Sequence, residues 1–346
     1  MKKIIALVVC VLLVVAVFAA CSAEEATAEV EEAVEEATAE VEDAAEETSE
    51  ATTGTADAAE GGRIFFTNAF YTAPYCGPLN QSITDTAAKY GYEVTIVDGE
   101  GDGAVQLDQI ETAISEKYDA ILYFPADGAS SINIVKRLVE SGIPFINNNS
   151  MVDESVQDQV HYVGIDAYAQ GCTAAEMAME LFPDGCNVVI VQGAGGSGPE
   201  VGRTNGFLDT INDNVKVLAM QTADWDPAKA LSVTQDFISK YGDQIDVIYT
   251  EDDGMYEGAY QAAADAGVAD KYKFISVSGN SVGIQAIRDG HLYCTVAHSP
   301  VAEGVLTIET LMKMLNGEEV EAKTILESVP VTIDNVEDPE FADPGW

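Results

Sequence analysis

From Gly62 to Trp346 the chain alternates short apolar runs with amphipathic stretches, and this alternation constrains the fold more than any other feature. The apolar runs are rich in Val and Ile, which is typical of buried strands, and the stretches between them have the helical period. Strands that alternate with helices form βαβ units, in which helices cover both faces of a mostly parallel sheet. We therefore predict an α/β fold.

The predicted strands are 63–68, 93–97, 120–124, 144–147, 162–164, 187–192, 215–221, 247–250, 274–278 and 294–297. The predicted helices include 79–90, 104–116, 131–141, 169–181, 201–211, 227–240, 256–266 and 300–315. This number of strands is larger than expected for a single doubly wound sheet. The sequence thus favours two α/β lobes.

The chain carries 59 acidic and only 16 basic residues, a formal net charge of −43. Such a surface repels the phosphate backbone, so nucleic acid is excluded as a partner. The charge favours a soluble protein that works away from phosphate-rich surroundings.

Residues 1–20 have the layout of an export signal: Lys2 and Lys3, an apolar run, and small residues before Cys21. The pattern resembles a bacterial lipoprotein signal, in which the Cys receives a lipid, so we expect Cys21 to be lipidated and the protein to be held on the extracytoplasmic face of the cell membrane. Cleavage with Cys21 as an ordinary thiol, or an uncleaved anchor, are the alternatives. All three export the protein.

Residues 21–61 form an acidic, low-complexity stretch with almost no large apolar side chains. It cannot bury enough surface to offset the entropy of ordering, so we predict a tether. Residues 24–34 are nearly repeated in 35–45, but like charges and the small size of Val and Ala argue against a coiled coil.

Polar and aromatic residues follow the predicted strands, at the sheet edge where ligands bind in parallel sheets. They include 69–71, 98–99, 125–127, 147–149, 193–203, 222–226, 251–253 and 279–280. Hydrogen-bonding side chains with a few aromatic faces suit a small, neutral, hydroxyl-rich molecule.

The glycine-rich segment 193–198 matches G-x-G-x-x-G, follows a strand and precedes a helix. A dinucleotide site is one interpretation, but Pro199 and Glu200 occupy the start of the helix, where a pyrophosphate would bind. The favoured interpretation is a flexible loop that lets Arg203 reach a ligand. A surface position for Arg203 is the alternative.

Signals for metal binding or catalysis are weak. The three histidines lie on separate segments without ligand spacing, and no G-x-S-x-G motif supports a triad from Ser281, His298 and an Asp. The acidic residues 251–253 lack a calcium-loop spacing and favour the N-cap of a helix. We expect no metal, no cofactor and no catalytic residue.

Cys76, Cys172, Cys186 and Cys294 remain if Cys10 leaves with the signal and Cys21 is lipidated. They form no C-x-x-C pair, and a chain of this size does not need disulfides for stability. We predict free thiols, with Cys172 and Cys186 as small core residues.

A longer pattern resembles a known family. The matching stretches, in order, are 73–75, 88–92, 119–127, 141–146, 163–166, 203–207, 223–226, 252–259 and 289–290. In order and spacing they resemble the type I periplasmic sugar-binding proteins, the ribose- and galactose-binding receptors of ABC transporters. The resemblance implies two doubly wound parallel-sheet lobes joined by a three-strand hinge. Lobe one would comprise residues 62–164 and 299–327, and lobe two residues 165–298 and 328–346.

Carried over position by position, the resemblance implies a ligand site formed by Tyr75, Asn149, Arg203, Trp225, Asp252, Ser278 and His298. Tyr75 and Trp225 would stack on the apolar face of a sugar, and Arg203 would bind its hydroxyls. A core position is the alternative for Trp225. Departures from the ribose pattern are Cys76 for an aromatic, Asn149 for an acid, Ser150 for Arg, Asp252 for Asn, Ser278 for Asp and His298 for an amide.

The resemblance implies a monomeric, non-enzymatic solute-binding lipoprotein that binds a monosaccharide or related polyol between its lobes, closes, and delivers it to the permease subunits of an ABC importer. The alternatives are a receptor that reports its ligand to a sensor or chemoreceptor, a binder of a nucleoside, furanosyl signal or amino sugar, and an NAD-dependent enzyme.

The departures leave the ligand open between two types. A carboxylate at Asp252 only accepts, and His298 can donate from both nitrogens when protonated, so one type is a ligand rich in donors or weakly cationic, such as an amino sugar. If instead Arg203 faces Asp252 and neutralises it, the site suits a neutral sugar, which we favour because unpaired buried charge is costly.

Overall fold

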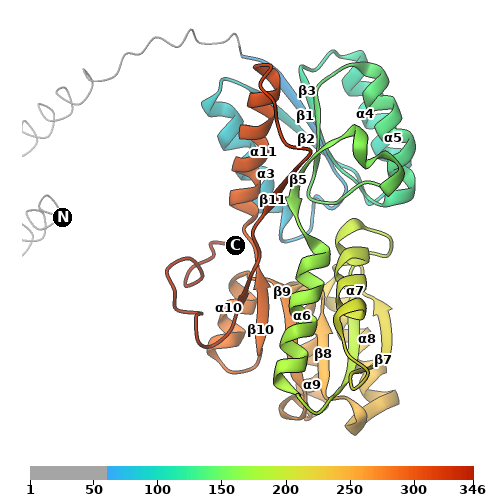
Figure 1. Ribbon diagram of the computed structural model, residues 1–346, viewed down its shortest axis with the longest axis vertical. Coiled ribbons are helices and arrows are strands. Elements are labelled where there is room, and N and C mark those ends of the chain that lie inside the picture. Colours follow the sequence, from blue (N-terminus) through green and yellow to red (C-terminus); the bar gives the residue numbers. More distant parts are fainter. Residues whose placement is uncertain (1–60) are drawn as a thin grey trace, which may run out of the picture. The chain divides into compact units, whose positions relative to one another are not determined.

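The computed structural model describes residues 61–346, which form two α/β lobes (Figure 1). The predicted signal, the Cys21 lipidation site, the possible coiled coil and nearly all of the tether lie outside the described residues. Each lobe has a six-stranded sheet between two layers of helices, which confirms the predicted fold class.

The sheet of lobe one has the strand order β11-β5-β4-β3-β1-β2, and all its strand pairs are parallel. Its strands are β1 (Arg63–Asn68), β2 (Glu93–Asp98), β3 (Ala120–Phe124), β4 (Phe145–Asn148), β5 (His161–Ile165) and β11 (Lys323–Leu326).

The sheet of lobe two has the order β12-β10-β9-β8-β6-β7, and only β12 is antiparallel to its neighbour. Its strands are β6 (Asn187–Gln192), β7 (Lys216–Thr222), β8 (Val247–Thr250), β9 (Lys273–Ser278), β10 (Cys294–Ala297) and β12 (Val329–Val331).

The side-chain alternation of each central strand supplies two cores, one on each face of its sheet. In β1, Phe66 packs under α3 (Cys76–Lys89) and α11 (Pro300–Leu315), whereas its neighbour Phe65 faces the opposite core. Val189 and Ile190 of β6 divide in the same way between the two cores of lobe two. Successive residues of a strand point to opposite faces, so a continuous apolar run is what a doubly covered sheet needs.

The remaining helices complete the layers around the two sheets. In lobe one these are α4 (Gly103–Ser115), α5 (Gly128–Ser141) and the short η1 (Glu154–Gln159). In lobe two they are α6 (Ala167–Leu181), α7 (Gly198–Thr210), α8 (Pro227–Tyr241), η2 (Gly242–Gln244), α9 (Asp253–Asp265), η3 (Ala269–Lys271) and α10 (Ser281–Arg288).

The chain passes between the lobes three times: from β5 to α6, from β10 to α11, and from β11 to β12. All ten predicted strands are present, with ends that differ by at most a few residues. Strands β11 and β12 and helix α10 were not predicted. Both strands are short and lie at sheet edges, and β12 contains Pro330, so neither has the apolar run of a central strand.

Several helices begin three residues before their predicted start, as α5, α7 and α9 do. Their first turns contain small or polar residues that lack the apolar period. In α5 and α9 a side chain satisfies the free amides: Asp127 accepts from Ser130 N, and Asp252 accepts from Gly254 N and Met255 N. Each helix therefore starts close to the strand end that precedes it.

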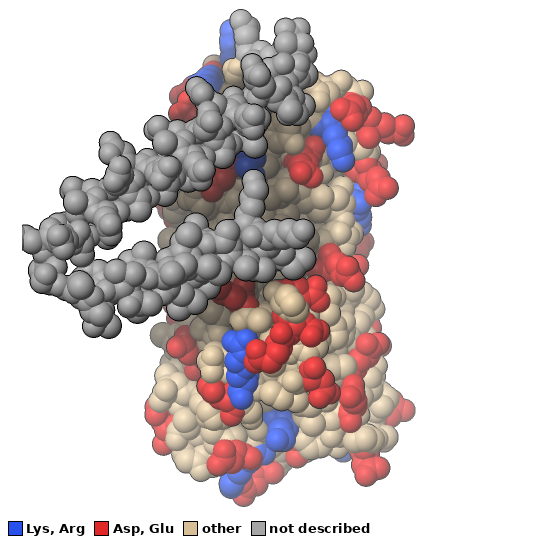
Figure 2. Space-filling view, turned by 90° about the vertical axis from the view of Figure 1, so that its left-hand side faces the viewer, with Lys and Arg blue, Asp and Glu red and all other residues tan. Residues whose placement is uncertain are grey.

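Acidic side chains are spread over both lobes on the face drawn in Figure 2, and Lys and Arg occur there as isolated groups or beside acids. Four ion pairs join described residues, and all lie at the surface: Arg137–Glu111, Lys229–Asp224, Lys271–Asp243 and Arg288–Glu337.

Candidate functional site

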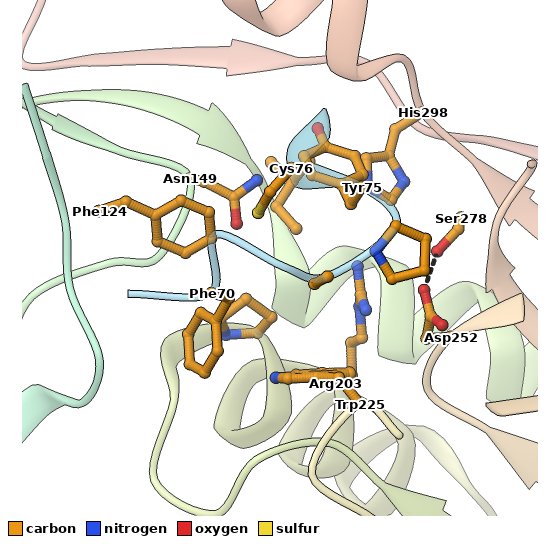
Figure 3. Close-up of a pocket in the computed structure, with 14 residues that line it drawn as sticks. Phe70, Tyr75, Cys76, Phe124, Asn149, Arg203, Trp225, Asp252, Ser278 and His298 are labelled. Atoms are coloured by element: carbon orange, nitrogen blue, oxygen red, sulfur yellow. Dashed lines mark hydrogen bonds between the residues drawn. The ribbon is translucent and has the colours of Figure 1, made fainter. Parts of the chain in front are cut away.

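One cavity, with walls from both lobes, is lined by all seven residues of the predicted ligand site (Figure 3). It contains about 530 Å³ of space, part of it open to solvent. The structure brings these residues together; that they bind a ligand stays a prediction. The lining residues that the predicted site lacks are Phe70, Ala73, Pro74, Cys76, Phe124, Ile165 and Pro199.

The topology explains why positions so far apart in the sequence meet here. Asn149, Trp225, Asp252 and His298 all come directly or within a few residues after a strand, and Ser278 ends one. The carboxyl ends of the strands of the two sheets face the cavity, the usual ligand position in open α/β sheets. The strand ends were therefore the right place to search.

Two phenylalanines of lobe one form an apolar side of the cavity. The rings of Phe70 and Phe124 meet edge to face, with centroids 5.7 Å apart. Phe70 follows β1 and Phe124 ends β3, so their positions at carboxyl ends of strands could have identified both. Their faces suit the C–H surface of a sugar ring.

Tyr75 lies at the start of α3 and presents its ring rather than its hydroxyl. The hydroxyl donates to Glu303 Oε2 at 2.6 Å, and the ring packs against His298 with centroids 5.1 Å apart. Burial and the nearby Glu303 carboxylate raise the pKa of Tyr75 well above its usual value. The hydroxyl therefore stays protonated at neutral pH.

Arg203 on α7 is buried, with 4% of its surface exposed, so the surface alternative is wrong. Its Nε donates to Gln170 Oε1 at 2.9 Å, and its Nη1 donates to the Glu251 carbonyl at 2.5 Å. Its guanidinium carbon lies 5.8 Å from the Trp225 ring centroid. These contacts fix the guanidinium where Figure 3 places it, beside the indole.

The expected pairing of Arg203 with Asp252 is wrong. Among the described residues Arg203 has no carboxylate within ion-pair distance. Asp252 is held instead by α9, whose first amides donate to its Oδ1, and by Ser278, whose hydroxyl donates to its Oδ2 at 2.8 Å. Two amides at the positive end of the helix and one hydroxyl stabilise the carboxylate in place of a guanidinium. The N-cap function expected for this acidic run is confirmed.

Trp225 is half-buried and lies over a glycine. Its backbone has a left-handed φ of +61°, and a Cβ added at Gly193 would come within 2.0 Å of the indole. A side chain at position 193 would therefore displace the ring from the cavity. Part of the indole also packs on the lobe-two core, so the core alternative holds for one part of this side chain only.

The glycine-rich segment has no free anion site at its first amides. Gly193 N donates to Glu251 Oε2 at 2.8 Å, and Gly196 N donates to Glu200 Oε2 at 3.0 Å. In a dinucleotide site such amides face the pyrophosphate. Because two carboxylates occupy that position here, the segment is unsuited to a phosphate.

His298 is buried, and burial together with the nearby Arg203 lowers its pKa from the ordinary 6.5 to about 3. The imidazole is therefore neutral at pH 7, which corrects the expectation that it donates from both nitrogens. Arg203 donates to Gln170 Oε1, so Gln170 Nε2 donates to His298 Nδ1, at 3.2 Å, and the ring proton resides on Nε2. The suggested partner Ser281 is exposed and has no hydrogen bond to this ring.

Three carboxyl groups around the cavity are fully buried: Glu251, Asp253 and Glu303. Burial raises the pKa of Glu251 to about 8 and those of Asp253 and Glu303 to about 7. Asp253 accepts from Gly279 N, Asn280 N and Thr295 Oγ1. The sequence placed Glu251 and Asp253 at the ligand edge of the sheet but did not predict their burial, and Glu303 was not predicted at all. Within residues 61–346 no group of three potential ligands is placed to hold a metal ion.

The cysteines of the described part of the chain are free thiols, as predicted. Cys76, Cys186 and Cys294 are buried, and burial raises the pKa of Cys76 and Cys294 to about 12. Cys172 is only half-buried, so its prediction as a core residue holds less well. Cys76 lines the cavity as a small apolar group.

The two lobes touch through glycine amides beside the cavity. Gly198 N donates to the Ser150 hydroxyl oxygen at 3.0 Å, and Gly128 N donates to the Gly196 carbonyl at 3.3 Å. A Cβ at Gly198 would come within 2.7 Å of Met151 N. The glycine-rich segment thus permits close approach of the lobes.

No helix in residues 61–346 combines the length and apolar character that a membrane crossing requires.

The matching family and the most similar named relatives describe the same kind of protein. The family described as "Periplasmic binding protein domain" matches residues 64–319. The fructose import binding protein of Bifidobacterium longum is 30% identical over 228 residues, 64% of this chain and 69% of that protein. The ribose import binding protein of Salmonella typhimurium is 28% identical over 251 residues, 72% of this chain and 83% of that protein.

Among solved structures, an ABC transporter solute binding protein from Bacillus halodurans with bound myo-inositol superimposes with a TM-score of 0.76. It is 26% identical, and the match covers 83% of this chain and 99% of the other. Family, relatives and fold agree: the chain belongs to the periplasmic binding protein family.

Proposed function

We propose that this protein is a non-enzymatic solute receptor that binds a neutral monosaccharide or related polyol in the inter-lobe cavity and presents it to an ABC importer. The observation that supports this most is the composition of the cavity. The aromatic faces of Tyr75, Phe70 and Trp225 line the same cavity as the fixed guanidinium of Arg203 and a few oriented acceptors. Such a site covers the C–H face of a ring and matches its hydroxyls.

The relatives support the same ligand class. The two import proteins are named for fructose and ribose, and the solved structure contains myo-inositol. These three compounds share many hydroxyls and no charge. The neutral His298 and the capping function of Asp252 favour a neutral ligand over an amino sugar.

The position of the protein in the cell is part of the proposal. The signal-like residues 1–20 and Cys21 support export and lipid anchoring, with residues 21–61 as a tether to the membrane. A receptor held at the surface can meet permease subunits repeatedly. Closure of the lobes around the solute would present both of them together to the permease.

Thermal-shift and calorimetric titrations test the ligand class. The panel is D-fructose, D-ribose, myo-inositol, glucosamine, adenosine and NAD. A ligand at 100 times its dissociation constant stabilises the folded state by about 2.7 kcal/mol. We expect stabilisation by at least one of the first three compounds. Stabilisation by glucosamine, adenosine or NAD alone would contradict the proposal, as would no response to any compound.

A further inference from the structure

Glu303 is a buried carboxyl group that no part of the proposed binding reaction yet uses. It lies in the first turn of α11 and is fully buried. Among the described residues it has no cationic partner. An ionised carboxylate in such a place is costly unless hydrogen bonds stabilise it.

Three side chains supply those hydrogen bonds, and two of them line the cavity. Tyr75 Oη donates to Glu303 Oε2 at 2.6 Å, and Asn149 Nδ2 donates to the same oxygen at 3.0 Å. Asn148 Nδ2 donates to Oε1 at 3.1 Å. Tyr75 and Asn149 come from different elements, so Glu303 joins two separate parts of the lobe-one wall.

The carboxylate decides which end of the Asn149 amide faces the ligand. An ionised carboxylate only accepts, so Nδ2 must turn toward it and Oδ1 must turn away. Figure 3 shows this orientation, with the nitrogen of Asn149 toward Tyr75 and the oxygen directed away from it. The Asn149 backbone is held as well, because the Tyr162 hydroxyl contacts its carbonyl at 2.5 Å.

We propose that Glu303 is a positioning residue that sets the ligand preference of the lobe-one wall. By holding Asn149 Nδ2 and the Tyr75 hydroxyl proton, it leaves Asn149 Oδ1 as the amide atom that can accept from the ligand, beside an aromatic face. This inference rests on the proposed function. It assigns to the ligand a hydroxyl that donates to Asn149, so an analogue with a hydrogen or methoxy group there binds more weakly.

The ionisation of Glu303 supports this coupling. Burial raises its pKa to about 7, and the hydrogen bonds from Tyr75, Asn149 and Asn148 oppose that rise. The titratable groups that face it are Tyr75 and Cys76 of α3 and Tyr162 of β5, and all three have raised pKa values and stay neutral. Below pH 7 Glu303 gains a proton and can donate as well as accept, so it no longer requires Asn149 Nδ2 to face it.

The first test compares Glu303→Gln with Glu111→Gln. Glu111 is an exposed lobe-one acid paired with Arg137, so it controls for loss of one charge. Binding of D-ribose, D-fructose and myo-inositol is measured by calorimetry from pH 6.0 to 8.5. We expect Glu303→Gln to bind about 10- to 100-fold more weakly at pH 8 and to lose the pH dependence, and Glu111→Gln to resemble the wild type. Unchanged affinity in Glu303→Gln would overturn the inference.

The double variant Asn149→Asp/Glu303→Gln separates positioning from a structural effect. It exchanges carboxylate and amide, so an amide at 303 can donate to the carboxylate at 149, which still presents an acceptor to the cavity. We expect affinity within about fivefold of the wild type. If the double variant binds no better than Glu303→Gln, Glu303 is merely structural.

A measurement without ligand keeps this inference distinct from the proposed function. The side-chain Nδ2 resonances of Asn149, assigned by their loss in Asn149→Asp, are followed by NMR from pH 6 to 8. We expect a shift near pH 7 in the wild type and none in Glu303→Gln. If the shift is present but no sugar binds, the proposed function fails and the coupling stands. If the shift is absent, the inference fails whatever binds.

Discussion

The polar side chains on the two walls of the cavity are held in place by different kinds of contact. On the lobe-two wall, polar side chains are fixed by the main chain: Asp252 caps α9, and Arg203 donates to the Glu251 carbonyl. On the lobe-one wall, aromatic and small apolar groups dominate, and Asn149 is fixed by one distant side chain, Glu303. The polar groups of the lobe-two wall are anchored by secondary structure, whereas the orientation of the Asn149 amide on the lobe-one wall depends on one side chain, Glu303.

This difference implies that the lobe-two wall mainly determines the affinity for ligands and the lobe-one wall mainly determines which ligand is preferred. Groups fixed by helix ends and carbonyls are preorganised, so they contribute most to affinity. A group whose orientation depends on one side chain can be reoriented by one substitution. We therefore expect substitutions in lobe two to weaken all ligands, and substitutions around Glu303 to change which ligand is preferred.

The largest expected effect is that of Arg203→Met. It removes a buried guanidinium and leaves Gln170 Oε1 and the Glu251 carbonyl without their donor. We expect affinity for the best ligand of the panel to fall at least about 100-fold, since hydrogen bonds to charged groups contribute about 1.5–3 kcal/mol each. Calorimetry measures it, with Arg137→Met, at an exposed ion pair, as the matched control. Equal losses in both variants would contradict the anchored lobe-two wall.

Trp225→Ala comes next. The indole covers one side of the cavity beside Arg203, so its loss removes a large apolar face. We expect binding to weaken by about 2–3 kcal/mol, as for a central aromatic hot spot, and Trp225→Phe to recover part of this. Titration of both variants at constant pH is the measurement. If Trp225→Ala binds as the wild type does, the residue only packs on the core.

Tyr75→Phe tests the lobe-one wall with a smaller change. It keeps the ring but removes one of the donors to Glu303. We expect affinity to fall about fivefold, near 1 kcal/mol, and the preference among the panel to shift. Tyr118→Phe is the control, because it also loses one hydroxyl hydrogen bond in lobe one, to Thr95, away from the cavity. An equal loss of affinity for every sugar would contradict the expectation that the lobe-one wall sets the ligand preference.

The smallest effect is a pH dependence of stability. The folded-state pKa values of Glu251, Asp253 and Glu303 are raised, to about 8, 7 and 7. Between their ordinary and raised values the folded protein holds protons that the unfolded chain has lost, so stability falls as pH rises through this window. We expect the melting temperature without ligand to decrease from pH 6.5 to 8.5.

His298, whose pKa is lowered to about 3, acts in the opposite sense but only as pH falls below its ordinary 6.5. The range from pH 6.5 to 8.5 therefore isolates the carboxyl groups. Glu251→Gln and Glu303→Gln should each flatten the slope, one from each wall. A melting temperature that rises across this range would show that these carboxyls are not protonated when folded.

The fold was predictable because its signals are local. Central strands such as β3 and β6 are continuous apolar runs, and burial on both faces demands such runs. Strands β11 and β12 have only 4 and 3 residues, and β12 contains a proline, so neither left such a run. The starts of α5 and α9 were missed because their first turns are held by capping rather than by apolar packing.

The seven candidate site residues came from the resemblance to a known family. Two of them also lie at a strand end: Asn149 directly follows β4 and Ser278 ends β9. Glu303 was not predicted, because its position in α11 resembles that of any solvent-facing acid of an amphipathic helix. Its burial depends on the approach of Asn149, 154 residues earlier in the chain. The three consecutive asparagines 147–149 were the available signal, since buried amides require acceptors from elsewhere.

We expect the hydrogen bond between Gly198 and Ser150 to affect the residence time of a solute without contributing a contact between the solute and the cavity walls. Each hydrogen bond between the lobes is replaced by water when they part, so its net contribution is about 1 kcal/mol. We expect a bound solute to leave only after this contact breaks, and hinge motions of this kind take microseconds to milliseconds. We therefore expect removal of the Ser150 hydroxyl to shorten the residence time of a solute without removing any side chain that lines the cavity.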